Sequence, residues 1–519
     1  MRRLELRRGR HVSFDTQSIC QVISHKKEVG MTDVVEQSED ASSPNRLNSG
    51  VLGLFDSVIM GIAGSAPAYS IGATTGALFF AVAYGGPAAL LYCGFFMFGI
   101  VWAFSYLSRD DSHAGAAYSW VRRAIHPILG YLSGWALIVS ALLFMVIATF
   151  PAGSSVLRLF SSTLYKQTGP VTILGALFFF AMVAAVALGV TVTVKVQILM
   201  STVEIFLLLL FAGLALFHAH HVTAFSWHWF SPSVFSGHHT NDFVAGALLA
   251  AFYYWGWDVT ANLNEETKNA KKTSGLGGLL GTFIVFLLFE VFTVASNMTL
   301  KPGTLANSSN VADFMYNLGQ AVWHGLGGKL LIVALLLSTV ATLETTLIQV
   351  TRTLFTMGRD ETLPKVLGTT HPTRKTPFVA TMVVTVLSLG LFVASQYVGS
   401  VGNILVDGYN AIAIQICIYY SLAGRAVVIL FRRQLFDSMN NFIFIGLWPL
   451  LGALFMIYLF VKSIPGLNRV ELIVGLGSMA LGLIPMAWYW FKGAPYFKMP
   501  DKLDRHAQQL ELKQMEELL

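Results

Sequence analysis

Long apolar segments separated by short polar stretches recur along the chain after residue 50. Each is about 20 residues or longer, which is enough to cross the hydrocarbon core of a bilayer as a helix. The twelve segments that we expect to span lie at about 52–82, 86–107, 116–150, 171–191, 194–218, 242–266, 274–298, 329–356, 377–396, 401–431, 442–462 and 470–491. The pattern therefore predicts an all-α integral membrane protein of the cell membrane, with about twelve transmembrane helices.

The first segment contains a run of small residues that ends in proline, Gly61-Ile-Ala-Gly-Ser-Ala-Pro67. Proline has no N–H and disfavours the α conformation in the residue before it, so we expect the helix to stop near Ser65 and restart at about Pro67. Backbone freed inside a membrane must be buried in protein or line a cavity. The restarted helix should present unbonded N–H groups and a positive dipole end, which suit a carboxylate.

The sixth segment supplies a second interruption. It is apolar as far as Trp255 and then reaches Gly256-Trp257-Asp258 at membrane depth. Broken helices of this kind mark binding sites in secondary transporters, and a charged residue inside a span indicates function. Since the breaks are five spans apart, we expect spans 1–5 and 6–10 to form inverted repeats, at about 51–220 and 240–435. The alternative is a packing glycine and an ordinary proline kink.

Composition and charge support a membrane protein and give it a direction. Only 12% of the residues are charged and 55% are hydrophobic, whereas soluble proteins carry about 25% charged residues. With a cytoplasmic N-terminus, six of the 34 Lys and Arg residues fall outside: Arg158, Lys166, Lys301, Lys329, Lys462 and Arg469. The positive-inside rule therefore predicts that both chain ends are cytoplasmic. A basic face for nucleic acid is absent from the sequence outside the loops and tails.

The ends of the chain are expected to be cytoplasmic tails, at 1–50 and 493–519, and helices 11 and 12 occupy 440–492. A polar, acidic stretch begins at Met31, so we expect the true start there and regard residues 1–30 as an upstream translation artefact. The cysteines Cys20, Cys93 and Cys417 have neither paired nor metal-ligand spacing. We predict no metal and no cofactor.

Several motifs resemble the amino acid–polyamine–organocation (APC) transporters. They are GIAGSAPAYS (61–70), AGAAYSWVRRAIHPILGYLSGW (114–135), NLNEETKNAKKT (262–273), RTLFTMGRDETLPKVLGTTHPTRKTP (352–377) and YYSLAGRAVVILFRR (419–433). The resemblance covers about residues 50–435. It implies a LeuT-like five-plus-five fold with broken helices 1 and 6, and peripheral helices 11 and 12. It also implies amino acid or amine substrates moved by proton- or exchange-coupled alternating access.

The resemblance also implies a substrate site at the two breaks. The backbone of the first break would meet the α-amino and α-carboxylate groups, although Gly64-Ser65-Ala66 departs from the family's usual Gly-Ser-Gly. The second break would contribute an aromatic lid and unwound backbone. The residues expected at the substrate are Ile62, Gly64, Ser65 and Ala66, with Phe252, Tyr253, Trp255, Gly256 and Trp257. Alternatively the aromatic residues only pack, or form an interfacial belt.

Carboxylates within predicted spans are candidates for proton coupling, because burial favours their protonated form. They are Asp56, Glu204, Asp258, Glu290, Glu344 and Asp407. Asp258 is the first candidate for coupling or gating; alternatively it caps the second half-helix. Glu204 stands where some proton-coupled relatives carry a lysine, so it is either a coupling group or a bonded structural carboxyl. We have no specific role for Glu290, Asp407 or Asp56.

Glu344 has two interpretations: it faces the site and favours cationic substrates, or it pairs with an inner-loop arginine or a packing hydrogen bond. Ser338 and Thr339 could bind sodium, but hydroxyls in membrane helices usually bond backbone. Proton coupling is thus preferred to sodium.

Two groups of charged or titratable residues lie in the loops. Candidate cytoplasmic gates combine Lys268, Lys271, Lys272, Arg352 and Arg359 with Glu265, Glu266, Asp360 and Glu361; alternatively these residues are solvated. The loop after span five contains His218, His220, His221, His228, His238 and His239, whose irregular spacing favours a plain polar loop over a metal or pH-sensing site. Asn297 and Asn307 begin glycosylation sequons, a pattern of low specificity.

The sequence predicts a secondary active transporter of an amino acid or amine, with proton-coupled uptake, and not an enzyme. An amino acid/amine exchanger is the alternative within that class. A transporter-like sensor or a membrane enzyme is the alternative from another class, disfavoured by the short tails and by the lack of a catalytic cluster in the sequence. The expected partners are the substrate and the lipid bilayer, with no particular oligomeric state predicted.

Overall fold

The computed structural model describes residues 45–235, 240–300, 311–397 and 401–498, and only the backbone of 240–242 and 401–407. The regular secondary structure of these residues is helical, and their one strand-like contact is an isolated bridge between Leu52 and Thr267. Within the described ranges, ten helical runs are long and apolar enough to cross a membrane. One of them, Leu54–Asp110, contains the first two predicted spans, and the apolar helix of the predicted sixth span is shorter, Phe243–Tyr253. The protein is thus an all-helical, multi-pass membrane protein.

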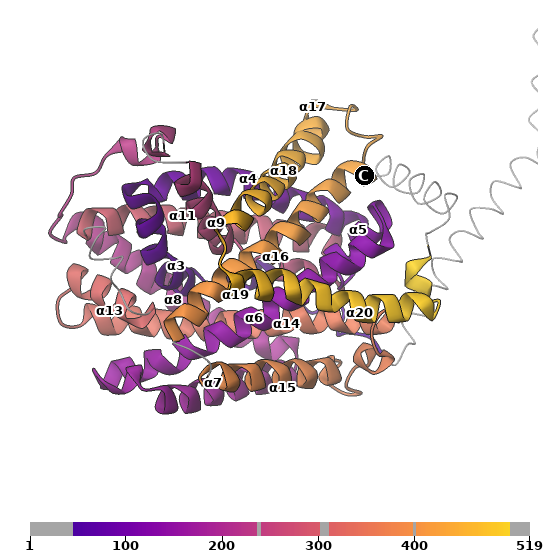
Figure 1. The fold of residues 1–519 in the computed structure, drawn as a ribbon, viewed down its shortest axis with the longest axis horizontal. Coiled ribbons are helices and arrows are strands. Elements are labelled where there is room, and N and C mark those ends of the chain that lie inside the picture. Colours follow the sequence, from indigo (N-terminus) through magenta and orange to yellow (C-terminus); the bar gives the residue numbers. More distant parts are fainter. Residues whose placement is uncertain (1–44, 236–239, 301–310, 398–400, 499–519) are drawn as a thin grey trace, which may run out of the picture. The chain divides into compact units, whose positions relative to one another are not determined.

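Most helices follow the predicted apolar segments (Figure 1), but the third predicted span, 116–150, is divided between a short helix and a long one that ends ten residues later, at Phe160. Their bounds are α2 Leu54–Ser65, α3 Pro67–Val82, α4 Gly86–Asp110, α5 Ala117–Ala124, α6 Pro127–Phe160, α7 Thr168–Leu188, α8 Val190–Phe217, α9 Thr240–Tyr253, α10 Val259–Asn262, α11 Ala270–Thr299, α13 Val311–Val322, α14 Gly327–Arg359, α15 Phe378–Ser395, α16 Val401–Leu430, α17 Met439–Asn441, α18 Trp448–Ser463, α19 Arg469–Leu472 and α20 Ser478–Phe491. Two π-helical turns, Phe442–Leu447 and Ile473–Gly477, begin the last two spans.

One helix was not anticipated by the hydrophobic pattern. α13 is too short and too polar to register as a span, and it packs against α3 and α14. Met315 and Val311 of α13 lie directly over α3 at Gly72. The structure therefore places a short helix across the C-terminal half of the broken first span.

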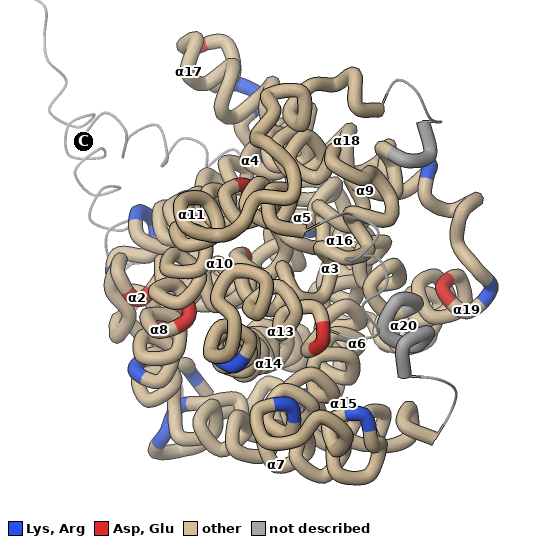
Figure 2. The backbone as a smooth tube through the Cα atoms, turned by 90° about the vertical axis from the view of Figure 1, so that its left-hand side faces the viewer, with Lys and Arg blue, Asp and Glu red and all other residues tan. Residues whose placement is uncertain are grey.

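The centre of the fold is formed by α6, α14 and α16, the last two of which both contact the broken spans. α6 packs along α14 and α16, whereas α7 and α15 lie together at the lower edge in Figure 1. Charged residues are sparse on this framework: Figure 2 shows them as isolated positions on a backbone made mostly of uncharged residues. Buried α14 and α16 are accordingly well placed to hold the interrupted helices.

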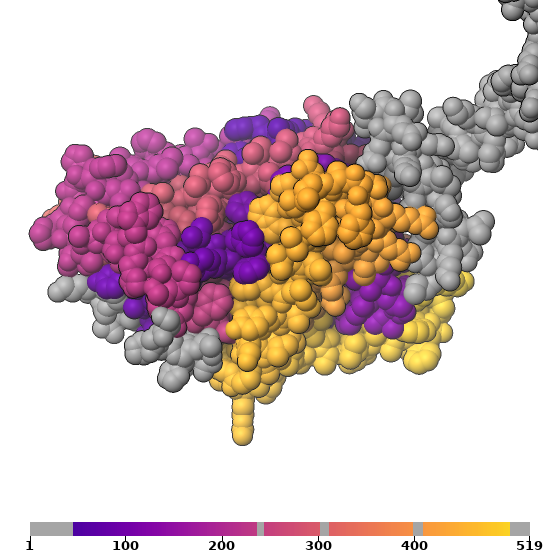
Figure 3. Space-filling model, turned by 90° about the horizontal axis from the view of Figure 1, so that it is seen from above, coloured from indigo at the N-terminus to yellow at the C-terminus, as the bar shows by residue number. Residues whose placement is uncertain are grey.

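The C-terminal spans lie outside this centre. α18 packs on α4 and α16, and the indole N–H of Trp448 donates to the Phe95 carbonyl oxygen at 2.7 Å. In the space-filling view of Figure 3 the α17–α18 segment, in orange, and the loop after α8, in magenta, flank a purple strip of the early chain. The hydroxyl of Tyr92 in α4 donates to the Phe230 carbonyl oxygen of that loop, at 2.8 Å.

The first break has the predicted position. α2 ends at Ser65, α3 begins at Pro67, and Ala66 between them is left-handed, with φ 49° and ψ 65°. The Ala66 N–H is bonded back to the carbonyl oxygens of Ile62 and Ala63. Proline at the first helical position then restarts the helix without an unsatisfied donor.

The two breaks touch each other through backbone. A Cβ added to Gly64 would lie 2.2 Å from the carbonyl oxygen of Gly256, and one added to Gly256 would lie 2.2 Å from that of Gly64. Gly256 also has φ +99°, a conformation that side chains other than hydrogen rarely allow. Both glycines are therefore required by close approach, and the matched interruptions predicted from sequence meet in space.

We expect G64A and G256A to destabilise the protein by about 1–3 kcal/mol, because the added methyl group overpacks a rigid backbone contact. Thermal unfolding of purified protein in detergent measures this effect. G213A is the matched control, since a Cβ at Gly213 of α8 meets nothing within 4 Å. Wild-type melting temperatures for both G64A and G256A would contradict the backbone contact.

Candidate functional site

The start of α3 does not offer the unbonded N–H groups that the sequence led us to expect. The N–H of Ala68 donates to Oε1 of Glu204 at 2.8 Å, and that of Tyr69 donates to Oγ of Ser338 at 3.1 Å. Pro67 has no N–H, and the next N–H, of Ser70, bonds the Ala66 carbonyl oxygen. The expectation of free donors was wrong: a carboxylate does occupy this helix N-terminus, but the protein supplies it from α8.

The other first-break residues are held by neighbouring helices. The hydroxyl of Thr342 in α14 donates to the Gly64 carbonyl oxygen at 3.2 Å. Ser65 donates to the Gly61 carbonyl oxygen, and its own carbonyl oxygen accepts from the hydroxyl of Ser70. Every side chain from Ile62 to Ala66 is buried. The break is therefore a packed element with defined hydrogen bonds.

Aromatic rings from five parts of the chain gather beside the breaks. We call Tyr69, Phe144, Phe252, Trp255 and Tyr409 the aromatic cage; they come from α3, α6, α9, the second break and α16. Ring centroids are 5.4 Å apart for Tyr69–Phe144, 5.4 Å for Phe144–Trp255 and 5.0 Å for Phe252–Tyr409. All five side chains are buried. The Tyr69 and Tyr409 hydroxyls are hydrogen-bonded at 3.0 Å.

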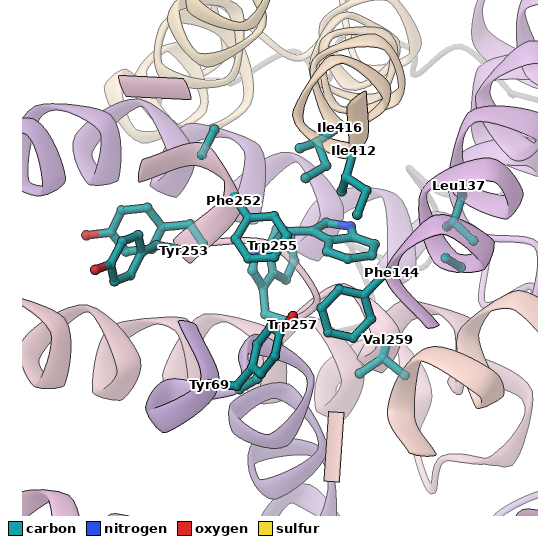
Figure 4. Close-up of a cluster of buried hydrophobic side chains, with 14 of the residues drawn as sticks. Tyr69, Leu137, Phe144, Phe252, Tyr253, Trp255, Trp257, Val259, Ile412 and Ile416 are labelled. Carbon is teal, nitrogen blue, oxygen red and sulfur yellow. The ribbon is translucent and has the colours of Figure 1, made fainter. Parts of the chain in front are cut away.

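The other two predicted aromatic residues lie elsewhere. Tyr253 is hydrogen-bonded to Thr75 of α3 at 2.5 Å and packs edge-on against Phe289 of α11. Trp257 packs against Phe104 of α4 and Tyr420 of α16. Figure 4 shows Tyr253 set apart from the group formed by Phe144, Phe252 and Trp255. The structure thus brings Phe252 and Trp255 together and separates Tyr253 and Trp257 from them.

Asp258 is linked to the cage by a directed hydrogen-bond chain. The indole N–H of Trp255 donates to the Tyr419 hydroxyl at 2.6 Å, and that hydroxyl donates to Oδ2 of Asp258 at 3.0 Å. Oδ1 of the fully buried carboxyl has no hydrogen-bond partner. Asp258 stands at the N-cap position of α10, but its side chain makes no capping bond. The capping interpretation is wrong for this side chain, because the carboxyl points to α16.

Glu344 and the two hydroxyls of α14 follow the second interpretation given to each. Oε2 of Glu344 accepts from the Gln197 side chain of α8 at 2.5 Å, which is a helix-packing hydrogen bond. Ser338 accepts from the Tyr69 N–H, and Thr339 donates to the Leu335 carbonyl oxygen at 2.6 Å. The Ser338 and Thr339 hydroxyls thus bond backbone.

Two arginines of α14 hold the segment that follows α10. Nε and a terminal nitrogen of Arg352 each lie 3.0 Å from a carboxylate oxygen of Glu266, and both side chains are buried. Arg359 also binds its partner in a bidentate manner: its two terminal nitrogens lie 2.7 and 3.2 Å from the two carboxylate oxygens of Glu265. Burial alone would raise the pKa of Glu265, but the Arg359 guanidinium holds that pKa below its ordinary value. The predicted arginine–glutamate partners are therefore in contact.

The backbone before α2 joins this cluster. The N–H groups of Val51 and Leu52 donate to the Glu266 carbonyl oxygen, and the Lys268 N–H donates to that of Leu52. Glu361 pairs with Lys365 at 2.8 Å, while the ion pairs of the described chain do not include Lys268, Lys271 or Lys272.

The remaining predicted positions have varied surroundings. Oδ2 of Asp56 accepts the Gly53 N–H and so caps α2. Asn297 is fully buried and donates to the Tyr84 carbonyl oxygen. Glu290 is buried with neither oxygen bonded. Within the described chain, His, Cys, Asp and Glu form no group suited to a metal. His238, His239, Asn307, Cys20 and the side chain of Asp407 lie outside the described residues.

Sequence reasoning missed Phe144, Tyr409, Tyr419 and Gln197. The first three are ordinary aromatic residues of apolar segments, and their sequence neighbourhood does not distinguish them from packing residues. Gln197 could have been found from its spacing. It lies on one helical face with Ser201 and Glu204, at i, i+4 and i+7, in a largely apolar stretch.

Comparisons with known proteins agree with this architecture. A family model described as amino acid permease matches residues 52–474. A branched-chain amino acid permease of Bacillus subtilis (strain 168) is 25% identical over a region that covers 52% of this chain and 58% of that relative. A low-affinity putrescine importer of Escherichia coli (strain K12) is 23% identical over 73% of this chain and 80% of its own length. A serine/threonine exchanger of Bacillus subtilis (strain 168) is 29% identical over 37% of this chain and 42% of its own length. Since the family model matches most of the chain, the protein belongs to the amino acid permeases of the APC superfamily.

Proposed function

We propose that this permease is a secondary active transporter that takes up an amino acid or a related amine together with protons. The observation that carries the proposal is the contact between two interrupted helices beside an aromatic cage and a buried carboxyl. The LeuT-like fold of twelve helices, its inverted repeats and its cytoplasmic termini are part of the proposal. The positive-inside distribution of Lys and Arg supports the orientation.

We place the substrate between the cage and the two breaks. Electron-rich rings attract an ammonium group, and Asp258 supplies a negative charge behind them. Phe252 and Trp255 are the proposed aromatic contacts, and the Gly64–Ala66 and Gly256–Asp258 backbone is the proposed polar contact. The Glu204 carboxylate already holds the Ala68 N–H, so a substrate carboxylate competes with Glu204 at α3.

Alternating access requires contacts that form in one state only. On the proposed cytoplasmic side these are the pairs Arg352–Glu266 and Arg359–Glu265. On the proposed outer side, Asp313 of α13 accepts from the Tyr165 hydroxyl at 2.5 Å and lies 3.4 Å from Arg158 of α6. Of these pairs only Arg352–Glu266 is fully buried. Removing one partner of a buried ion pair costs about 3–5 kcal/mol, so separating Arg352 from Glu266 needs compensation from substrate or proton binding.

An exchanger of two substrates is the second candidate. The likeness to a serine/threonine exchanger favours it. Exchange needs the same site and gates but no net proton movement.

Uptake into liposomes that contain the purified permease tests the function. The panel holds labelled branched-chain amino acids, serine, threonine, other amino acids and putrescine, with and without an imposed pH gradient. We expect at least one compound to accumulate when the pH gradient is applied. Exchange without gradient-driven uptake would favour the exchanger, and neither activity for any compound would contradict transport of amino acids or amines.

We expect D258N to reduce gradient-driven uptake more than exchange, because asparagine keeps the hydrogen bond from Tyr419 but cannot carry a proton. Both rates are measured on the same liposomes. An equal loss of both activities would assign Asp258 a structural role.

We expect F252L to raise the KM of the transported compound about 2- to 30-fold, because the variant loses one ring contact with an ammonium group. Y253F is the matched control, since Tyr253 lies outside the cage. Initial uptake rates are compared only for variants whose melting temperatures match that of the wild type, so that a change in KM does not reflect unfolding. A KM that rises in Y253F and not in F252L would place the site on the other side of α9.

A further inference from the structure

Three polar side chains form a line along the buried face of α8. Gln197, Ser201 and Glu204 are spaced i, i+4 and i+7, and each is fully buried. Glu204 and Gln197 are about 10 Å apart along the helix axis, and Ser201 lies between them. A buried line of this kind is costly inside a membrane unless its hydrogen-bonding capacity is used.

The lower end of this line contacts α14. The Gln197 amide nitrogen donates to the Ala341 carbonyl oxygen at 2.8 Å and to Glu344 Oε2 at 2.5 Å. Since both partners are acceptors, the nitrogen must face them, and Oε1 of Gln197 faces away. Ala63 of α2, Met200 and Ala341 pack together beside it, so three helices meet here.

The upper end contacts the broken first span through the Ala68 N–H, which donates to Glu204 Oε1. The line therefore connects the N-terminus of α3 to Glu344 of α14. Its two ends are carboxyls, Glu204 of α8 and Glu344 of α14.

Four oxygens of this group have no hydrogen-bond partner: Glu204 Oε2, Ser201 Oγ, Gln197 Oε1 and Glu344 Oε1. Three of them can only accept unless a carboxyl is protonated, and Ser201 supplies one hydroxyl donor. The group thus has more acceptors than donors. Protons on the carboxyls would correct this imbalance.

We infer that Glu204, Ser201, Gln197 and Glu344 form a proton relay from the N-terminus of α3 toward the membrane side where α2 begins. This inference rests on the proposed function and names the exit route of its proton. The Glu204 carboxyl releases a proton to water held by Ser201 and the Gln197 carbonyl oxygen, and the Glu344 carboxylate accepts a proton from that water. The net transfer leaves a carboxylate on Glu204 and a carboxylic acid on Glu344, and the water is regenerated.

Other charged groups near α8 already have partners or lie elsewhere. The helices packed against α8 are α2, α3, α7, α11, α13 and α14. Most titratable side chains of these helices in the described chain have a partner: Asp56 with Gly53, Tyr69 with Tyr409, Tyr316 with Arg158, Asp313 with Tyr165, Arg352 with Glu266 and Arg359 with Glu265. Glu290 of α11 lies near Tyr254. Lys271, Lys272 and Lys329 lie at helix ends. Lys195 of α8 is exposed.

The spacing favours protons over one bound metal ion. A sodium ion holds all its ligands in a single shell, whereas the two ends of this line are about 10 Å apart along α8. A relay of protons needs only neighbouring groups in hydrogen-bond reach. The line also ends toward the end of α14 that carries Arg352, the partner of Glu266. The proposed topology makes this side cytoplasmic.

The test compares E204Q and E344Q in liposomes with a pH gradient of one unit, using as probe whichever of isoleucine, serine and putrescine the wild type accumulates. One proton per substrate sustains about tenfold accumulation at this gradient. We expect both variants to bring accumulation to about onefold while exchange continues. E290Q is the matched control, a buried carboxyl outside the relay, and should keep tenfold accumulation.

Two results would overturn the relay. One is tenfold accumulation in E344Q. The other is uptake driven by a sodium gradient alone that is lost in E204Q and E344Q, which would make the group a sodium site.

A readout without substrate separates failure of the relay from failure of the transport proposal. Infrared difference spectra on acidification detect protonated carboxyl groups, and loss of bands in E204Q and E344Q assigns them. We expect deuterium exchange of the Glu204 band to slow at least about tenfold in Q197L, since the variant removes the side-chain amide that the relay places between the carboxyls. Q415L, which changes an equally buried amide in α16, should leave that rate unchanged. An unchanged rate in Q197L, or no titrating band from either carboxyl, would contradict the relay whether or not any probe is transported.

Discussion

The backbone contact between Gly64 and Gly256 is the constraint on which the rest of the structure depends. Two segments of backbone can approach to this distance only if neither residue carries a side chain at the contact. Each break then exposes peptide groups that a membrane does not solvate. The fold answers with side chains from other spans: Thr342 of α14 bonds Gly64, and Tyr419 of α16 bonds the carboxyl that follows Gly256.

The same constraint explains why polar side chains lie buried in the middle of the bundle. Freed peptide groups at the start of α3 are met by Glu204 and Ser338, from α8 and α14. A carboxylate at a helix N-terminus is favoured by the helix dipole as well as by the hydrogen bond. The chain thus places its own anion where the sequence suggested room for the carboxylate of a substrate. Binding at this end of α3 is consequently a competition, and the state of Glu204 decides how strongly the position is held.

Much of the fold was predictable because it depends on hydrophobic length and on proline. The stop at Ser65 and the restart at Pro67 follow from local chemistry, and the long spans follow from the apolar runs. The site was predictable only in part. Neighbouring residues of one turn point in different directions, so Phe252 reaches the cage while Tyr253 turns to α11. Phe144 and Tyr409 come from helices far away in sequence, and only tertiary packing selects them from many similar aromatic residues. The partner of Asp258 was equally hidden, because a cap and a bond to Tyr419 require the same residue type.

Two buried carboxyls, those of Asp258 and Glu204, stand in similar relations to the two breaks. Asp258 begins the helix after the second break and is held by Tyr419, whereas Glu204 is held by the helix after the first. In each case the bond joins a short half-helix to a long, continuous one. A proton added to either carboxyl weakens its acceptor strength and so loosens that half-helix from its support. If a proton moves along the proposed relay, protonation and movement of the half-helices are therefore coupled by the same hydrogen bonds. Gly64 and Gly256 lie just before these two half-helices and are in contact, so the two breaks are also linked directly through their backbones.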